Sequence, residues 1–358
     1  MRNGIENSVG VFMARLQRPR RRLCAIIRTC PAGRGDFAIG FFLFKRFASF
    51  ALTLLAASVV IFTVLDVLPG NAAEVMLGES ATPESVAALS AKLGLDRPAP
   101  VRYADWMKGL ATGELGTSIA YDTPIAQLVA ERLVVTVPLA LMAMALTTLL
   151  AFSLGLYAAS RHGRGGDIGV MAASQIGIAI PNFWFAILLI LAFAVKLRWF
   201  SAGGFPGWSE ADGGGVGAGL RALVLPAVAL AVVQAAILAR IVRSAVLDVL
   251  REDFVRTARA KGATPRGVLW GHVLRNAMVP VLTVMGLQFA NLLTGTVVIE
   301  NVFSLPGLGR LVFQAIANRD LLVVRDVVML LAAAVVLINF VVDVLYVVID
   351  PRLRVRAA

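Results

Sequence analysis

Six long apolar runs constrain this chain more than any other feature of its sequence. Each holds at least 18 residues with few or no charges, and a helix of that length spans most of the roughly 30 Å hydrocarbon core of a bilayer. Soluble domains rarely carry apolar residues in blocks of this length. The pattern predicts an all-α polytopic membrane protein with six transmembrane helices, at residues 47–67, 133–158, 168–195, 222–239, 276–299 and 327–349.

Proline stands inside four of these runs, where it removes one backbone hydrogen bond from a helix. Membrane helices tolerate such prolines when neighbouring helices or water satisfy the freed carbonyl groups. We therefore expect kinked helices that pack around a cavity. The four residues are Pro138, Pro181, Pro226 and Pro280.

Two segments before the second run differ from the apolar runs in composition. Residues 1–46 hold ten Lys and Arg residues against two acidic ones, which predicts a basic cytoplasmic tail that is disordered or lies on anionic lipid. Residues 68–131 have mixed charges and many turn signals, typical of a small extracytoplasmic region without room for an enzyme domain. Within it, Thr82 and Pro83 are expected to begin a short helix.

The rest of the chain is expected to form one membrane unit. The first span at 47–67 precedes it, and residues 132–349 hold the other five runs. A charged loop at 240–280 interrupts them and is expected to lie outside the bilayer. Residues 350–358 form a second short tail.

Lysine and arginine gather in alternate segments between the runs. If the N-terminus lies inside, the inner segments hold 23 of the 34 Lys and Arg residues, as the positive-inside rule requires. Six spans then place both termini in the cytoplasm. The same asymmetry accounts for the net charge of +12, so the charge gives no support for nucleic-acid binding. The inner segments are 1–46, 161–167, 240–275 and 350–358.

Motifs for catalysis or metal binding are missing from the sequence. It has no G-x-x-x-x-G-K-[ST] phosphate-binding loop, no H-E-x-x-H and no G-x-S-x-G, so we assign no catalytic residue, metal ligand or bound cofactor. The histidines, His162 and His272, are interpreted as surface residues of inner loops. Glu300 ends the fifth run and is interpreted as interfacial. The chain is expected to be a transport path that draws its energy from elsewhere.

Asp343 is the one acidic residue well inside an apolar run. An intramembrane carboxylate is a candidate proton site, which would suit a self-powered secondary transporter. However, Asp343 lies one to two helical turns from Asp350, near the expected inner end of its helix. The runs also show neither the second acid of a proton relay nor inverted repeats. These observations favour an Asp343 that reaches the membrane surface or pairs with a basic residue. The secondary transporter remains the alternative.

The charged loop at 240–280 has the pattern of a helix. Apolar residues recur every four positions and form one stripe, with charged and polar residues on the other side. Either the rest of the bundle or the groove of a partner protein must cover this stripe, because nothing in the loop does so. A solvated charged hairpin is the alternative, and physical reasoning alone leaves the choice open. The stripe consists of Val242, Val246, Leu250, Phe254 and Ala258.

A bend is expected at Gly262. The helix of the fourth run is expected to continue to this residue, because glycine enters the left-handed conformation without steric penalty. Thr264 then offers an oxygen to cap a second helix, and Pro265 suits its first position. That second helix is expected to run from Pro265 to Asn276 and into the fifth run.

The sequence of this loop, DFVRTARAKGATPRGVLWGHVLRNAMVPVLT, resembles the cytoplasmic loop of binding-protein-dependent ABC importer permeases with the type I fold. In that family a small-residue pair followed four positions later by glycine marks the loop that docks into the ATPase subunit. Arg256 stands where an acid is usual, but R-T-A-R-A-K-G and H-x-L-R-N are typical of the dipeptide and oligopeptide branch. The resemblance assigns ATPase coupling to Arg256, Thr257, Ala258, Ala260, Gly262, His272, Arg275 and Asn276.

Further segments resemble the same branch, in the order and at the spacing that the family has. The resemblance covers residues 41–354, and the long first outer loop is similar to that of the B-type subunit. The segments are L-P-G-N at 68–71, G-E-L-G-T-S at 113–118, I-P-N-F-W at 180–184, E-N-V-F-S-L-P-G-L-G at 300–309 and D-P-R at 350–352.

The resemblance implies an assembly at the bacterial inner membrane. Its other members would be a second permease that forms a heterodimer with this chain, two ABC ATPase subunits that use ATP and Mg²⁺, and an extracytoplasmic solute-binding protein. The chain, itself no enzyme, would move a di- or oligopeptide by alternating access. Nickel, glutathione or another small solute are alternatives within the branch, and no substrate-binding residue is assigned.

Overall fold

The computed structural model describes residues 34–67, 72–211 and 213–349, and every regular element in these ranges is a helix. The first long helix, α2, spans Arg34–Phe62 and ends in a π-helical turn. It begins before the expected start of the first span. The remainder of the basic tail, the L-P-G-N motif and the C-terminal tail lie outside the described residues.

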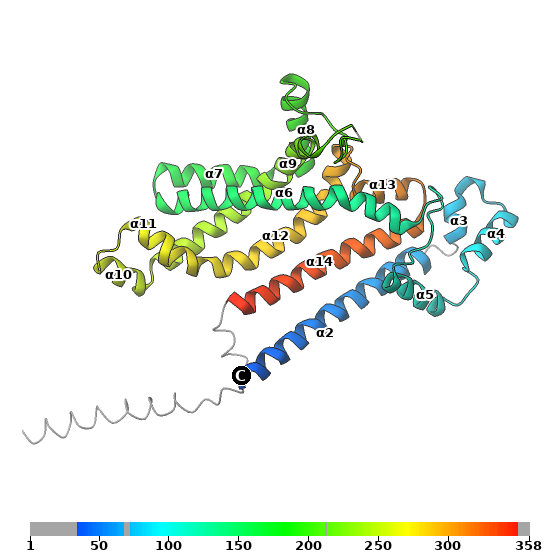
Figure 1. Cartoon of the computed structure of the whole chain (residues 1–358), viewed down its shortest axis with the longest axis horizontal. Helices are drawn as coiled ribbons and strands as arrows, with labels where there is room; N and C mark the ends of the chain where they lie inside the picture. The colour runs from blue at the N-terminus through cyan, green and yellow to red at the C-terminus, as the bar shows by residue number, and fades with distance from the viewer. Residues whose placement is uncertain (1–33, 68–71, 212, 350–358) are drawn as a thin grey trace, which may run out of the picture. The chain divides into compact units, whose positions relative to one another are not determined.

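Four helices form the centre of the bundle. They are α6 (Ile125–Ser160), α7 (Gly165–Ala179), α9 (Val216–Leu250) and α12 (Leu274–Val302). Helix α9 packs against each of the other three, and Figure 1 shows α6 and α7 running alongside each other. More of α9 is buried than of the other long helices. Its small residues allow this, because alanine and glycine let neighbouring backbones approach closely.

Helices α6 and α9 approach each other closely at Gly155. A Cβ atom at this position would lie 2.8 Å from the carbonyl oxygen of Ala239 and from the side chain of Val242. Glycine is therefore required by the distance between the two helices, since real Cβ atoms do not come this close to a backbone oxygen. The contact holds the two longest helices of the bundle together near one end.

The run at 168–195 forms two helices where one kinked span was expected. Helix α7 ends at Ala179, and α8 (Asn182–Leu189) continues as a π-helical segment to Lys196. The two halves are bent by 102° at Ile180 and Pro181. Both of these residues are extended. Proline favours this conformation in the residue before it, which here is Ile180. The bend is much sharper than an ordinary proline kink.

Five helices in the described part of the chain are long and apolar enough to cross a membrane, and the bent pair would be a sixth. The prediction of an all-α polytopic membrane protein is therefore confirmed in its coarse form. The five candidate spans are Leu43–Leu65, Ile125–Ser160, Val216–Leu250, Pro265–Val302 and Leu321–Val344.

The region after the first span is made of short helices, α3 (Ala72–Leu77), α4 (Pro83–Leu93) and α5 (Ala99–Thr112). The predicted start of α4 is confirmed: the backbone N–H of Ser85 donates to the Thr82 hydroxyl, and the backbone N–H of Thr82 donates back to Ser85. This capping box satisfies two backbone groups that the helix leaves open.

Two buried acids hold this region in place. Asp326 lies on the last long helix, α14 (Leu321–Ile349), and Asp320 immediately precedes that helix. Asp320 accepts hydrogen bonds from the Ser118 hydroxyl at 2.5 Å and from the backbone N–H of Ile119 at 3.0 Å. Asp326 accepts one from the indole N–H of Trp106 at 2.7 Å. The sequence pattern gave no sign of these contacts, because the partners are far apart in the chain.

Glu300 differs from its interfacial interpretation, because its side chain is fully buried. Its carboxyl oxygens accept hydrogen bonds from the Thr136 hydroxyl at 2.6 Å and from the backbone N–H of Gly309 at 2.7 Å. Gly309 lies in the first turn of α13 (Leu308–Ala317), where the backbone N–H groups have no partner within the helix. A Cβ atom on Gly307 would overlap the Glu300 carboxyl. The motif at 300–309 is therefore a buried helix cap.

Candidate functional site

The charged loop folds into two short helices between α9 and α12. Helix α9 continues past Arg240, as expected, but ends at Leu250, and α10 (Asp253–Ala260) begins after a break at Arg251 and Glu252. The expectation of a continuous helix to Gly262 is wrong. Glu252 is extended at this break. Neither glycine nor proline marks the position, so sequence reasoning had no signal for it.

The bend at Gly262 is confirmed. Its φ is +85°, and no atom lies within 4 Å of the position where a Cβ atom would stand. The backbone N–H of Gly262 donates to the carbonyl of Arg259, and that of Ala263 donates to Ala258. Thr264 then caps α11 (Pro265–Val268) by accepting from the backbone N–H of Gly267 at 3.2 Å. As predicted, this second helix runs on into α12, through a π-helical turn.

The bundle covers the apolar side of this loop. One core cluster joins α6, α9 and the loop, which settles the choice left open by the sequence: the hairpin is not merely solvated. The break before α10 changes which residues face inward. Val255 is fully buried, and Phe254, expected in the stripe, is 42% exposed. The loop contributes Val255, Val268, Val273 and Ala277 to the cluster, and α9 contributes Val242 and Val246.

The residues assigned to ATPase coupling lie almost all on the exposed side. Ala258 is the exception, because it is partly buried against the core cluster. Their polar groups make local contacts: the Thr257 hydroxyl donates to the carbonyl of Asp253, and the Asn276 amide donates to that of His272. The exposed members are Arg256, Thr257, Ala260, Gly262, His272, Arg275 and Asn276.

Two large apolar side chains accompany them. Phe254 on α10 is 42% exposed, and Trp270, just after α11, is 62% exposed. Sequence reasoning placed Phe254 in the covered stripe and did not single out Trp270. The loop thus combines a core-packed inner side with an exposed side that carries aromatic, small and basic residues. Such a surface can hold a partner protein.

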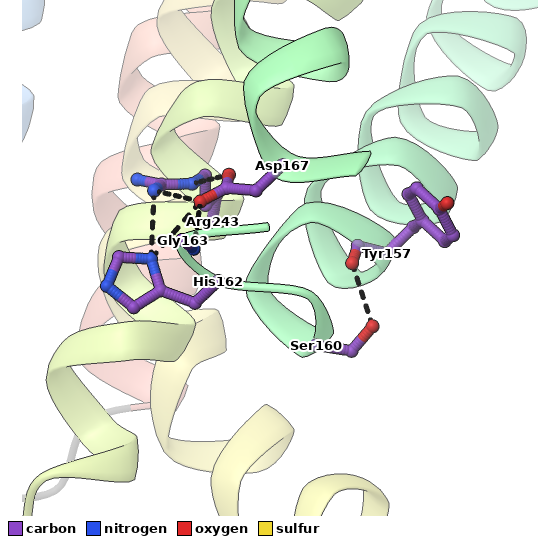
Figure 2. A network of polar contacts seen from close by, with 6 residues as sticks. All are labelled: Tyr157, Ser160, His162, Gly163, Asp167 and Arg243. Atoms are coloured by element: carbon purple, nitrogen blue, oxygen red, sulfur yellow. Dashed lines mark hydrogen bonds and ion pairs between the residues drawn. The ribbon is translucent and has the colours of Figure 1, made fainter. Parts of the chain in front are cut away.

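A partly buried polar network lies between α9 and the turn that joins α6 to α7 (Figure 2). The guanidinium of Arg243 contacts both carboxylate oxygens of Asp167, from Nε to Oδ1 at 2.5 Å and from Nη2 to Oδ2 at 2.7 Å. The backbone N–H of Gly163 donates to Asp167 Oδ2 at 3.0 Å. The His162 ring joins the network and is only half exposed, so its interpretation as a plain surface residue was incomplete.

Sequence reasoning missed this network. Asp167 and Arg243 are 76 positions apart and each looked like an ordinary charge at the end of an apolar run. In the described part of the chain, no group of three or more His, Cys, Asp and Glu residues is arranged to hold a metal ion.

Comparisons with known proteins agree with the family that the sequence of the loop resembles. The model of the family described as "Binding-protein-dependent transport system inner membrane component" matches residues 151–355, and the model of its N-terminal region matches residues 40–140. A peptide transport system permease protein of Brucella abortus is 42% identical over 87% of this chain and 98% of its own length. The di/tripeptide transport system permease protein DppB of Pseudomonas aeruginosa is 38% identical, over 87% of this chain and 98% of its own.

The fold is also similar to that of a solved transporter. A chain of the MetNI methionine ABC transporter, in an inward-facing conformation, aligns with a TM-score of 0.52 and 20% identity, over 63% of this chain and 97% of that one. At this identity the likeness concerns the fold alone. The two family models and the relatives cover the loop, the bundle and the region before them, and the chain belongs to the family of binding-protein-dependent transport system inner membrane components.

Proposed function

We propose that this chain is one permease subunit of an ATP-driven importer of di- or oligopeptides. Members of its family are inner-membrane permease subunits and not enzymes, and ATP hydrolysis belongs to separate subunits. The observation that carries the proposal is the loop of α10 and α11, which packs on the bundle's own core and exposes aromatic and small residues on its other side. The names of the Brucella and Pseudomonas relatives support peptides as the cargo.

In this proposal the chain crosses the inner membrane six times, with α7 and α8 counted as one bent span. The loop of α10 and α11 and both termini face the cytoplasm. The distribution of Lys and Arg supports this orientation, since the loop is among the most basic segments between spans. The short helices α3 to α5 then lie on the opposite side, where a solute-binding protein delivers its ligand.

The exposed side of the loop is the proposed docking surface for an ABC ATPase. Two ATPase subunits and a second permease, paired with this chain as a heterodimer, complete the assembly. Thr257 and Gly262 allow close approach because their side chains are small or absent, and Ala258, which packs against the core cluster, lets α10 lie close to the bundle. Phe254 and Trp270 would fill apolar pockets of the ATPase, since aromatic residues supply much of the binding energy at protein interfaces.

The proposed cycle is alternating access. ATP binding closes the ATPase dimer and pulls the loop with it, and the loop's shared core with α6 and α9 passes that movement to the bundle. The ATPase subunits use ATP and Mg²⁺, and this chain holds neither. No energy-yielding step is needed within the membrane helices.

Reconstitution of the full assembly tests the function. The chain is purified with its partner permease, both ATPases and the binding protein, and uptake of a labelled dipeptide into proteoliposomes is measured with and without ATP. ATP-dependent peptide uptake is expected. Uptake of glutathione or Ni²⁺ without any peptide uptake would contradict the peptide assignment but leave the importer in place.

A second arm tests the secondary transporter. The chain alone is reconstituted and exposed to a proton gradient. We expect no dipeptide uptake. Gradient-driven uptake that is lost in Asp343→Asn would overturn the proposal in favour of a self-powered transporter.

The docking surface is tested by Gly262→Asp. A carboxylate at this turn would stand where the ATPase must approach, so dipeptide uptake per ATP hydrolysed should fall about tenfold, a coupling loss near 1.4 kcal/mol, while the membrane subunits still assemble. Gly213→Asp is the matched control, because Gly213 has a φ of +88° and equally open surroundings but lies in the loop before α9. Equal uptake per ATP in both variants would refute docking at Gly262.

A further inference from the structure

We propose that Asp167 and Arg243 are positioning residues that fasten the turn between α6 and α7 to the end of α9, so that movement of α10 reaches α6, α7 and α9 as one body. We call the pair and its two neighbours, His162 and Gly163, the Asp167 clamp. This inference rests on the proposed function, because it concerns how the ATPase-driven movement is transmitted.

The geometry of the clamp ties two separate pieces of chain to one carboxylate. Arg243 approaches with two parallel N–H groups, an arrangement that fixes direction as well as distance. The same carboxylate accepts the backbone N–H of Gly163, whose φ of +72° turns the chain between α6 and α7. Figure 2 shows the carboxylate between the guanidinium and this turn. Asp167 therefore shapes its own turn and holds α9 at the same time.

His162 adds a third contact from the turn. Its Nδ1 lies 3.1 Å from Arg243 Nη2 and 3.2 Å from Asp167 Oδ2. The ring can accept from the guanidinium, which links the turn to α9, or donate to the carboxylate, which links the turn to the start of α7. The clamp thus joins His162 of the turn and Asp167 of α7 directly to one side chain of α9, and Gly163 joins it through Asp167.

Burial separates this pair from the surface ion pairs of the chain. The side chain of Asp167 is 5% exposed and that of Arg243 is 22% exposed. Arg97 and Asp105 also pair, but both are about half exposed, and exposed pairs contribute little. Removing one partner of this partly buried pair leaves the other charge without compensation. The clamp is therefore costly to open and is expected to stay closed while its helices move.

The clamp borders the core cluster that holds the loop. Val242 and Val246, on either side of Arg243 in sequence, are buried with Val255 of α10. Ala151 and Ala159 of α6 belong to the same cluster, and Gly155 brings α6 against α9 near the end of α6. A movement of α10 therefore reaches α9 through packing, and the clamp adds the turn and the start of α7 to the moving body.

The test uses the full reconstituted importer with Asp167→Asn, Arg243→Gln and the double variant. Matched controls are Asp248→Asn and Arg240→Gln, which remove the same charges from exposed positions of α9. The first readout is the amount of labelled dipeptide imported per ATP hydrolysed. The ratio is measured on purified, fully assembled complexes, so that loss of folded protein does not change it. The second readout is amide hydrogen exchange of residues 161–167.

The ratio is expected to fall at least about fivefold in each single variant, the low end of coupling between distant sites, and no further in the double variant, because both substitutions remove one interaction. Exchange of residues 161–167 should become about tenfold faster. The controls should match the unmodified chain. An unchanged ratio in Asp167→Asn, or additive losses in the double variant, would overturn the inference.

Arg243→Lys covers the case in which Asp167→Asn does not assemble. It keeps the charge but loses the two-pronged contact, and it is expected to lower the ratio at least about twofold; an unchanged ratio would reject the clamp. If the unmodified complex imports no peptide, the proposed function is wrong. The exchange measurement then still decides whether Asp167 and Arg243 hold the turn to α9.

Discussion

Single buried acids hold distant segments of this chain together. Glu300 caps α13 from the end of α12, Asp320 holds the loop at 118–120, and Asp167 holds α9. Each accepts hydrogen bonds from at least two donors on another segment, so the loss of one side chain leaves several buried polar groups unsatisfied. Such losses cost about 1–3 kcal/mol for each group left without a partner.

Glu300→Ala is expected to lower the stability of the isolated chain by about 2–4 kcal/mol. The substitution leaves a cavity and removes the acceptor of the Gly309 N–H and the Thr136 hydroxyl. Thermal unfolding in detergent measures the effect as a lower midpoint. Glu210→Ala is the control, since Glu210 is exposed, and its midpoint should not change. Equal midpoints for the two variants would show that Glu300 does not stabilise the fold.

Helices approach one another closely where small residues face each other. At Gly155 the backbone of α6 comes so near α9 that any larger side chain meets the carbonyl of Ala239. Gly169, also inside a helix of the bundle, has open space at its Cβ position. Substitution of the two glycines is therefore expected to change stability in opposite directions, although each glycine weakens a helix when the sequence alone is considered.

Gly155→Ala is expected to destabilise the bundle by about 1–3 kcal/mol, because an added methyl group forces α6 and α9 apart. Gly169→Ala should instead be neutral or stabilising by up to about 1 kcal/mol, since alanine favours the helix. Both variants are compared by thermal unfolding in detergent. If Gly155→Ala unfolds at the same temperature as Gly169→Ala, the close approach of the two helices is not a constraint.

The arrangement of the membrane spans is a property of the whole molecule. The proposed orientation places the loop before α9 outside and the loop of α10 and α11 inside, and the basic residues of the latter support it. Ala211 and Lys261 are exposed positions in these two loops. A reagent that cannot cross the membrane can distinguish them.

Cysteine labelling tests this arrangement. Cys24 and Cys30 are replaced by serine, and Ala211→Cys and Lys261→Cys are made separately. The labelling uses cells whose outer membrane has been removed. An impermeant maleimide should label position 211 while the inner membrane is intact and position 261 only after the inner membrane is opened. Labelling of position 261 from outside would reverse the orientation, and labelling of both from outside would contradict the count of six spans.

The sequence by itself determined features that depend on local pattern. Apolar runs longer than a bilayer core predict membrane helices whatever their neighbours are, and Thr82, Gly262 and Thr264 act on backbone groups within a few residues of themselves. For that reason the helical class, the bend of the loop and two helix starts were predictable. The resemblance of the loop to a permease family was also visible in the residues alone.

Tertiary structure decided what depends on packing between distant segments. The break before α10 exchanges Phe254 for Val255 in the core, and no local signal marks it. The burial of Glu300 and the pairing of Asp167 with Arg243 likewise depend on neighbours far away in the chain. A charge at the end of an apolar run has the same local pattern whether it meets water or a buried partner, and only the folded bundle distinguishes the two.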